Sequence, residues 1–287
     1  MHWRHATGII SLDRPRILGI VNVTPDSFSD GGRLRSIDDA RRHVDRLAEE
    51  GADVIDVGGE STRPQGATVV DVDEELRRVV PVIAAVVRDH PGLPVSVDTV
   101  KSRVAHDALG AGASIVNDVS GFRLDADMPA TCARARAGVI LMHSRGDVQD
   151  MATFVHATYG ADVVGDVIAE LDACVDVARR AGIADACIVI DPGIGFSKRG
   201  EHSVAVLGQL TRVVALGHPV LIGASRKRFI GEITAVATPA DRMAGTIGAN
   251  VAALERGARL FRVHDVKASR EALDVAWAIH RAGARVS

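Results

Sequence analysis

The sequence predicts an α/β fold, a single-domain (β/α)₈ TIM barrel. Eight short apolar runs of strand character alternate with longer segments of helical character along 287 residues, and such alternation favours a parallel sheet. An open doubly wound sheet is the alternative, but the GxGxxG turn expected after its first strand is absent. The expected strands are residues 17–21, 54–57, 95–97, 114–116, 139–142, 187–190, 220–222 and 259–263.

The segments between the strands carry apolar residues at helical spacing. In 38–50, for example, Ala40, Val44 and Leu47 recur near one face. Acidic residues stand at the expected helix starts, where they complement the helix dipole, and glycines stand near the expected helix ends. The expected helices are 38–50, 73–88, 101–109, 126–137, 161–181, 203–216, 240–255 and 268–281.

Residues 1–12 precede the first expected strand and form a short N-terminal extension. Ile9 and Ile10 lie in this stretch, and we expect them to pair in a small hairpin that closes the N-terminal end of the barrel. Residues 13–287 then form the barrel domain itself.

The composition disfavours nucleic acid and membranes as partners. The 34 basic and 37 acidic side chains give a net charge of −3, and only 3% of residues are aromatic. No apolar stretch is long enough to span a bilayer, and the first eight residues contain no apolar signal core. Cys132, Cys174 and Cys187 are odd in number and form no CxxC pair, so we expect a cytoplasmic protein without a thiolate metal site.

Polar residues recur at the expected carboxyl ends of the strands. Side chains two residues apart on a strand share a face, and an apolar or small residue precedes a polar one at this spacing on several strands. This pattern is typical of the pocket at the C-terminal end of a barrel. The pairs are Ile20 and Asn22, Ser96 and Asp98, Ile115 and Asn117, and Val189 and Asp191; Arg262 and His264 have the same spacing.

Three of these strand-end residues, together with Lys227, suit a polar heterocycle. The carboxylates of Asp98 and Asp191 can each accept two parallel hydrogen bonds from a guanidine-like ring edge. Asn117 can both donate and accept, and Lys227 can donate to a ring carbonyl or nitrogen.

A second set suits an anion. Thr62, Arg63, Arg262 and His264 combine guanidinium, hydroxyl and imidazole donors that match phosphate oxygens. His143 is equally compatible with a site or with a structural role. The glycine-rich stretches 24–36 and 58–70 are compatible with mobile lids or with plain turns.

Seven phrases carry a resemblance to a known family. They are GIVNVTPDSFSDGG, DVGGESTRP, SVDT, NDVSG, DPGIGF, SRK and RVHDV, in this order between Gly19 and Val266. The chain resembles the dihydropteroate synthases, pterin-binding enzymes of folate biosynthesis and the targets of sulfonamide drugs.

The resemblance implies a (β/α)₈ barrel that condenses 7,8-dihydropterin-6-ylmethyl diphosphate with p-aminobenzoate, giving dihydropteroate and diphosphate. It implies a homodimer, a Mg²⁺ ion bound by Asn22, and C–O cleavage ahead of amine attack, with Asp98 stabilising the pterin cation. The implied pterin residues are Asp98, Asn117, Asp191 and Lys227, flanked by Ile115, Met142 and Gly223. The implied diphosphate residues are Asn22, Arg63, Arg262 and His264. The aminobenzoate region would be formed by Thr62, Phe28, Pro64, Phe196, Lys227 and Arg228.

The catalytic residues that the resemblance implies are Asp98, Asp191, Lys227 and Arg262. Several other positions depart from the family's common pattern and leave these four in place. They are Ser144, Ser197, Arg199, Ser203 and Arg228. Two other functions compete with the synthase. A methyltransferase domain for methyl-tetrahydrofolate would not need Arg63, Arg262 and His264, and a paralogue without turnover would be expected to lack groups such as Asn22 or Lys227, which are present.

Overall fold

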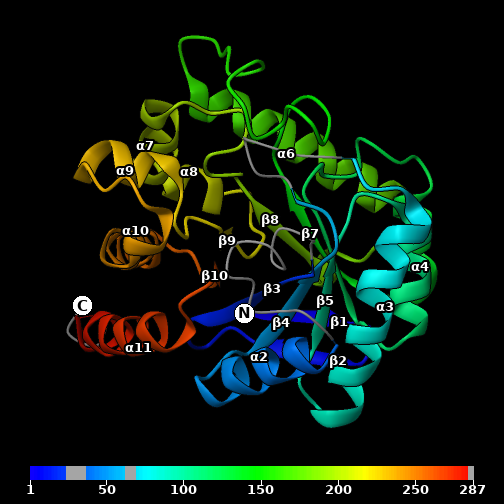
Figure 1. The fold of residues 1–287 in the computed structure, drawn as a ribbon. Coiled ribbons are helices and arrows are strands. Elements are labelled where there is room, and N and C mark those ends of the chain that lie inside the picture. The colour runs from blue at the N-terminus through cyan, green and yellow to red at the C-terminus, as the bar shows by residue number, and fades with distance from the viewer. Residues whose placement is uncertain (24–36, 62–68, 284–287) are drawn as a thin grey trace.

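The computed structural model describes residues 1–23, 37–61 and 69–283. A parallel sheet in the order β8-β7-β6-β5-β4-β3-β10-β9 curls into a barrel (Figure 1), and a parallel bridge between Ile190 and Val220 joins its two edges. The predicted barrel is therefore confirmed. Its strands are β3 (Arg16–Asn22), β4 (Val54–Gly58), β5 (Val95–Asp98), β6 (Ile115–Asp118), β7 (Gly138–Met142), β8 (Ile188–Asp191), β9 (Leu221–Ile222) and β10 (Leu260–Val263).

Helices surround the sheet and cover its outer face (Figure 1). The Asp71 side chain caps α3 by accepting from the amide of Glu74 at 2.9 Å, as its place before an acidic first turn suggests. The helices are α2 (Ile37–Glu49), α3 (Val72–Asp89), α4 (Ser102–Gly110), α5 (Met128–Ala135), α6 (Val163–Arg180), α7 (Gly200–Gly208), α8 (Leu210–Val214), α9 (Arg228–Thr234), α10 (Met243–Glu255) and α11 (Val266–Gly283).

One helix prediction was wrong, and one helix was not predicted. The expected helix 203–216 is two helices, because Gln209 adopts φ −110° and ψ 26° and interrupts the turn between α7 and α8. The apolar spacing continues through this break, so periodicity could not locate it. The helix α9 was not predicted, since seven residues give too short a pattern to recognise.

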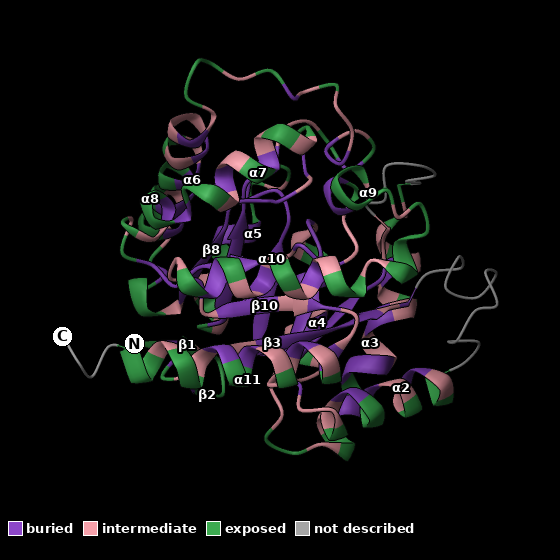
Figure 2. Cartoon of the chain, turned by 90° about the vertical axis from the view of Figure 1, so that its left-hand side faces the viewer, coloured by how far each residue is buried: buried purple, intermediate pink, exposed green. Residues whose placement is uncertain are grey.

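Two apolar layers hold the barrel together. The large outer layer lies between strands and helices, and Figure 2 shows buried residues on the inward faces of α10 and α11 and exposed residues outside. The inner layer fills the bottom of the barrel with one inward residue from each of seven strands, and it packs against Trp3, Ile10 and Leu12 below it. The seven residues are Leu18, Val54, Ile115, Ile140, Val189, Leu221 and Leu260.

The N-terminal residues form an antiparallel hairpin of β1 (His2–His5) and β2 (Gly8–Ser11) under the barrel. Trp3 on β1 is fully buried, and its Nε1 donates to the carbonyl of Cys187 at 3.0 Å. Truncating such a residue to alanine costs roughly 3–5 kcal/mol. The hairpin thus stabilises the end of the barrel opposite to the strand-end polar residues. Among the described helices, none has the length and hydropathy of a membrane-spanning segment.

Candidate active site

The carboxyl ends of the strands bring the predicted polar residues into the barrel. Three of them lie two residues beyond members of the inner apolar layer, on the same strand face. Asn117 follows Ile115, Asp191 follows Val189, and Arg262 follows Leu260. The next layer above the apolar floor is therefore polar, and Asn117 and Asp191 are only 3% and 4% exposed.

Strand register sets Asn22, Asp98 and Asn117 in one row across the sheet. Asn22 pairs with Gly58, Gly58 with Asp98, and Asp98 with Asn117. Gly58 carries no side chain, and a Cβ there would lie 3.4 Å from the Cβ of Asp98. The row therefore places three polar side chains at one level across the sheet, and Gly58 leaves the position beside Asp98 without a side chain.

Arg262 joins two carboxylates at the centre of this layer. Its Nε donates to Oδ2 of Asp56 at 2.6 Å, and its Nη2 donates to Oδ2 of Asp98 at 2.7 Å. The Asn117 amide also donates to Oδ2 of Asp56, at 3.3 Å. Asp56 is fully buried, and its Oδ1 has no hydrogen-bond partner among the described residues. One buried carboxylate thus orients both a guanidinium and an amide.

Burial shifts the pKa values of the charged groups in the site. It raises the pKa of Asp98 to about 7, helped by neighbouring acids and opposed by Arg262. Burial likewise raises the pKa of Asp191 to about 6, against a 2.7 Å hydrogen bond from the amide of Gly193. Burial works to lower the pKa of Arg262, but Asp56 and Asp98 together raise it, so the guanidinium stays charged. Two acids that titrate near neutrality therefore face a permanent cation.

Lys227 enters the site from the N-terminal end of α9. It occupies the residue before the helix, and its Nζ lies 3.7 Å from the centroid of the Phe196 ring. Burial, followed by the nearby charge of Arg262, lowers the pKa of Lys227 to about 7. Position 223 approaches Asp191 closely, since a Cβ on Gly223 would lie 3.7 Å from its Oδ2. Met142, at the end of β7, pairs in register with Asp191 and is buried.

His264 lies just beyond β10 and is held by Ser225. The Ser225 Oγ lies 3.0 Å from Nδ1 of His264 and accepts from its backbone amide at 3.2 Å. Two hydrogen bonds between Arg226 and Asp265 fix the same pair of loops. His143 instead lies outside this polar layer, between the buried Lys198 and the partly exposed Glu170. Phe28, Thr62, Arg63 and Pro64 lie outside the described residues.

Comparison with known proteins decides the family. The model for pterin binding enzymes matches residues 18–264. The dihydropteroate synthase of Mycobacterium leprae is 44% identical over 282 residues, which cover 96% of this chain and 98% of the relative. The chain belongs to the dihydropteroate synthase family of pterin-binding enzymes.

Solved dihydropteroate synthases share its architecture. The Xanthomonas albilineans enzyme with 4-aminobenzoic acid superposes with a TM-score of 0.87 at 48% identity, covering 95% of both chains. A Yersinia pestis dihydropteroate synthase in a sulfonamide drug complex gives a TM-score of 0.90 at 37% identity, covering 98% of this chain and 100% of that one.

Asp56 is the main site residue that the sequence analysis missed. It lies two residues beyond Val54 of the inner layer, so the period-two pattern that singled out Asn117 also applies to it. Asp56 is the first residue of the phrase DVGGESTRP, which served only as evidence for the family resemblance. In this member of the dihydropteroate synthase family, Asp56 is the partner that holds Arg262.

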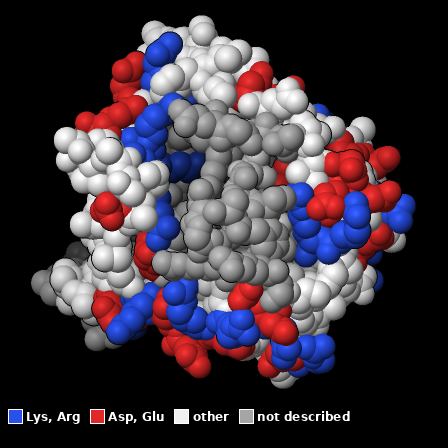
Figure 3. All heavy atoms as spheres, viewed as in Figure 1, with Lys and Arg blue, Asp and Glu red and all other residues white. Residues whose placement is uncertain are grey.

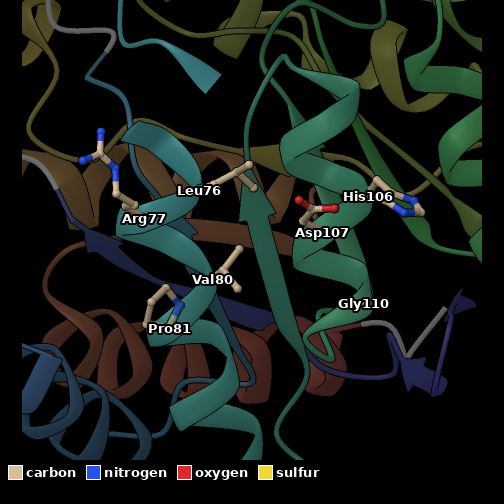
Figure 4. A pocket seen from close by; sticks show the side chains of 7 residues that line it. All are labelled: Leu76, Arg77, Val80, Pro81, His106, Asp107 and Gly110. Atoms are coloured by element: carbon tan, nitrogen blue, oxygen red, sulfur yellow. The ribbon is translucent and has the colours of Figure 1, made fainter. Parts of the chain in front are cut away.

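The surface has a basic region near the site and a separate groove on the outside of the barrel. On the molecular face shown in Figure 3, a strip of Lys and Arg side chains lies on the side of α7 and α9. Arg228, at the start of α9, stacks on the ring of Phe154 with 3.8 Å between its Cζ and the ring centroid. A groove between α3 and α4 (Figure 4) lies on the outside of the barrel, lined by residues such as Leu76, Val80 and His106, and is separate from the strand ends.

Proposed function

We propose that this chain condenses 7,8-dihydropterin-6-ylmethyl diphosphate with p-aminobenzoate to give 7,8-dihydropteroate and diphosphate, in folate biosynthesis. The observation that carries the proposal is the convergence of Asp98, Asn117, Asp191 and Arg262 in one inward layer, with Lys227 beside it. Family membership supports the same reaction.

The pterin would bind deep in the barrel. Asp191 and Asp98 are carboxylates that match the amino-imine edges of a pterin, and Asn117 supplies both a donor and an acceptor. The pKa values of both acids are raised in the free protein, so a ring that donates hydrogen bonds would favour their ionised forms. Ile115, Met142 and Gly223 would flank the ring.

The diphosphate would lie nearer the mouth, against Arg262 and His264. Arg63 and Thr62 would complete its donors by family resemblance. Asn22 ends β3 and offers an amide oxygen, a donor that Mg²⁺ accepts. No group of three His, Cys, Asp or Glu side chains suited to a metal occurs in the described part of the chain. We propose that Mg²⁺ is held between Asn22 and the substrate phosphates, where it would neutralise charge on the leaving group.

The residues would stabilise charge rather than attack the substrate. The bond between the methylene carbon and the diphosphate oxygen breaks, and its electron pair leaves with the diphosphate. The aminobenzoate nitrogen then forms the new C–N bond and loses a proton. Asp98 would lie beside the ring that carries positive charge in between. Arg262, which donates to Asp98, would extend from there to the diphosphate. Such positioning requires no covalent nucleophile.

The acceptor would approach over Phe196, Lys227 and Arg228. Phe196 is largely buried with its ring against the Lys227 ammonium, and the guanidinium of Arg228 supplies positive charge at the start of α9. Phe28 and Pro64 would add to this region by family resemblance.

We also propose a cytoplasmic homodimer. The exposed apolar residues Val275 and Ile279 are one helical turn apart on α11, with 63% and 68% exposure. A shared face on α10 and α11 would bury them. Sedimentation of the wild type and of the double variant Val275→Glu, Ile279→Glu tests this proposal; a monomeric wild type would contradict it.

An assay of diphosphate release tests the reaction. Purified protein with Mg²⁺ and both substrates should release diphosphate continuously, and omission of p-aminobenzoate should abolish turnover. Well-folded protein without aminobenzoate-dependent release would refute the synthase activity.

A further inference from the structure

Lys198 is a buried lysine that the reaction described above does not use. It follows Phe196 and Ser197 in the loop between β8 and α7, and it is only 1% exposed. Its Nζ has three acceptors: Nδ1 of His143 at 2.7 Å, the Phe196 carbonyl at 3.1 Å and the Gly193 carbonyl at 3.2 Å. Burial lowers the pKa of Lys198 to about 7, against the charges of Asp191 and Glu170. An ammonium has three N–H donors, so the three contacts match the charged form one for one.

The proton positions of His143 follow from its neighbours. Its Nε2 lies 3.0 Å from Oε2 of Glu170. Burial works to raise the pKa of Glu170, but hydrogen bonds from His143 and Arg145 lower it to about 2, so the carboxylate only accepts. Burial and the charge of Lys198 lower the pKa of His143 to about 4, so the ring is neutral near pH 7. The proton therefore lies on Nε2, which leaves Nδ1 to accept from Lys198.

The network sets the turn that follows β8. Gly193 adopts φ +67°, and a Cβ there would lie 1.9 Å from the carbonyl oxygen of His143, so this turn presses directly on the end of β7. Lys198 binds the carbonyls at both ends of the stretch from Gly193 to Phe196. The Phe196 residue thus contacts two lysines: its carbonyl accepts from Lys198, and its ring faces the ammonium of Lys227.

We propose that Lys198 is a positioning residue, whose ammonium, oriented through His143 and Glu170, holds the Phe196 ring against Lys227 and so shapes the site for the aminobenzoate acceptor. The inference rests on the proposed function, because it names the acceptor side of the same site. Asp98 and Asn117 lie on paired strands outside this network, and Asp191 contacts it through the backbone amides of Gly193 and His143. The network therefore controls acceptor binding more than pterin binding.

Steady-state kinetics of Lys198→Met test the proposal. Methionine keeps much of the length and apolar stem but removes the donors. We expect KM for p-aminobenzoate to rise about tenfold, while KM for the pterin diphosphate stays within about threefold of wild type. Arg180→Met removes an exposed positive charge from the last turn of α6 and should leave both constants unchanged. Wild-type turnover measured beside them separates failure of this inference from failure of the proposed function.

Two further measurements keep the test decisive if Lys198→Met does not fold. Glu170 is 40% exposed, so Glu170→Gln should fold, and we expect it to raise KM for p-aminobenzoate about threefold by loosening His143. Nitrogen-15 NMR of the wild type should show His143 as the Nε2–H tautomer with an unprotonated Nδ1. An Nδ1–H tautomer, or unchanged acceptor KM in folded Lys198→Met or in Glu170→Gln, would overturn the proposal.

Discussion

Asp56 holds Arg262 through a 2.6 Å hydrogen bond from Nε to Oδ2, across a sequence separation of 206 residues. The other end of the same guanidinium reaches Asp98. Asp56 therefore fixes the direction of a cation that faces both the pterin and the diphosphate regions of the site.

Asp56→Asn should weaken this arrangement without unfolding the barrel. Asparagine keeps the shape and one acceptor but loses the charge. A hydrogen bond to a charged group contributes about 1.5–3 kcal/mol, so kcat/KM for the pterin diphosphate should fall about 10- to 100-fold. Asp13→Asn, at a side chain that is 75% exposed below the barrel, is the control. Equal kcat/KM in the wild type and Asp56→Asn would contradict a role for this carboxylate.

Pterin binding should strengthen as the pH rises through about 6. The pKa of Asp191 is raised by burial to about 6, so the free protein holds this proton below that pH and must lose it to accept two hydrogen bonds. Affinity at pH 5 should therefore be about tenfold lower than at pH 7.5, and the raised pKa of Asp98 acts in the same direction. Calorimetry of wild type and Asp191→Asn checks this, since ionisation of the ligand itself is common to both. A pH dependence that is identical in the two proteins would exclude Asp191 as its source.

Lys227→Ala should leave a folded barrel with severely reduced activity. Lys227 is the residue directly before α9, so the removal of its side chain disturbs no strand. Loss of a preorganised donor costs about 100-fold or more in rate. Circular dichroism establishes folding, and kcat/KM close to that of the wild type would remove Lys227 from the site.

Arg228→Ser should raise KM for p-aminobenzoate by about two- to fivefold, because an interaction with a half-exposed charge contributes at most about 1 kcal/mol. Serine is the residue that the family resemblance leads us to expect at this position. Arg77→Ser, on the exposed face of α3, removes the same charge elsewhere and should have no effect. A lower KM in Arg228→Ser would show that the arginine hinders the acceptor.

Gly193→Ala should destabilise the protein by more than about 3 kcal/mol, because a Cβ would collide with the His143 carbonyl as well as occupy a left-handed backbone. Gly182 has φ +90°, and no neighbouring atom lies within 4 Å of the place that a Cβ would take, so Gly182→Ala should cost only about 1–2 kcal/mol. Urea unfolding of the two variants measures the extra cost of the collision. Equal losses in the free energy of unfolding would show that the turn relaxes away from β7.

The sequence predicted the parts of this molecule that depend on local periodicity. Period-two spacing placed Asn117, Asp191 and Arg262 in the barrel, because the side-chain direction on a strand follows from position alone. The pairing of His143 with Lys198 could not be predicted in this way, since it joins residues 55 apart on different loops. The roles expected for Thr62, Arg63, Phe28 and Pro64 fall outside the described residues and stay predictions.

The stoichiometry of the products tests the central claim most directly. Protein incubated with Mg²⁺, the dihydropterin diphosphate and p-aminobenzoate should form dihydropteroate and diphosphate in equal amounts, identified by mass spectrometry and phosphate analysis. Diphosphate without dihydropteroate, or neither product from folded protein, would contradict it.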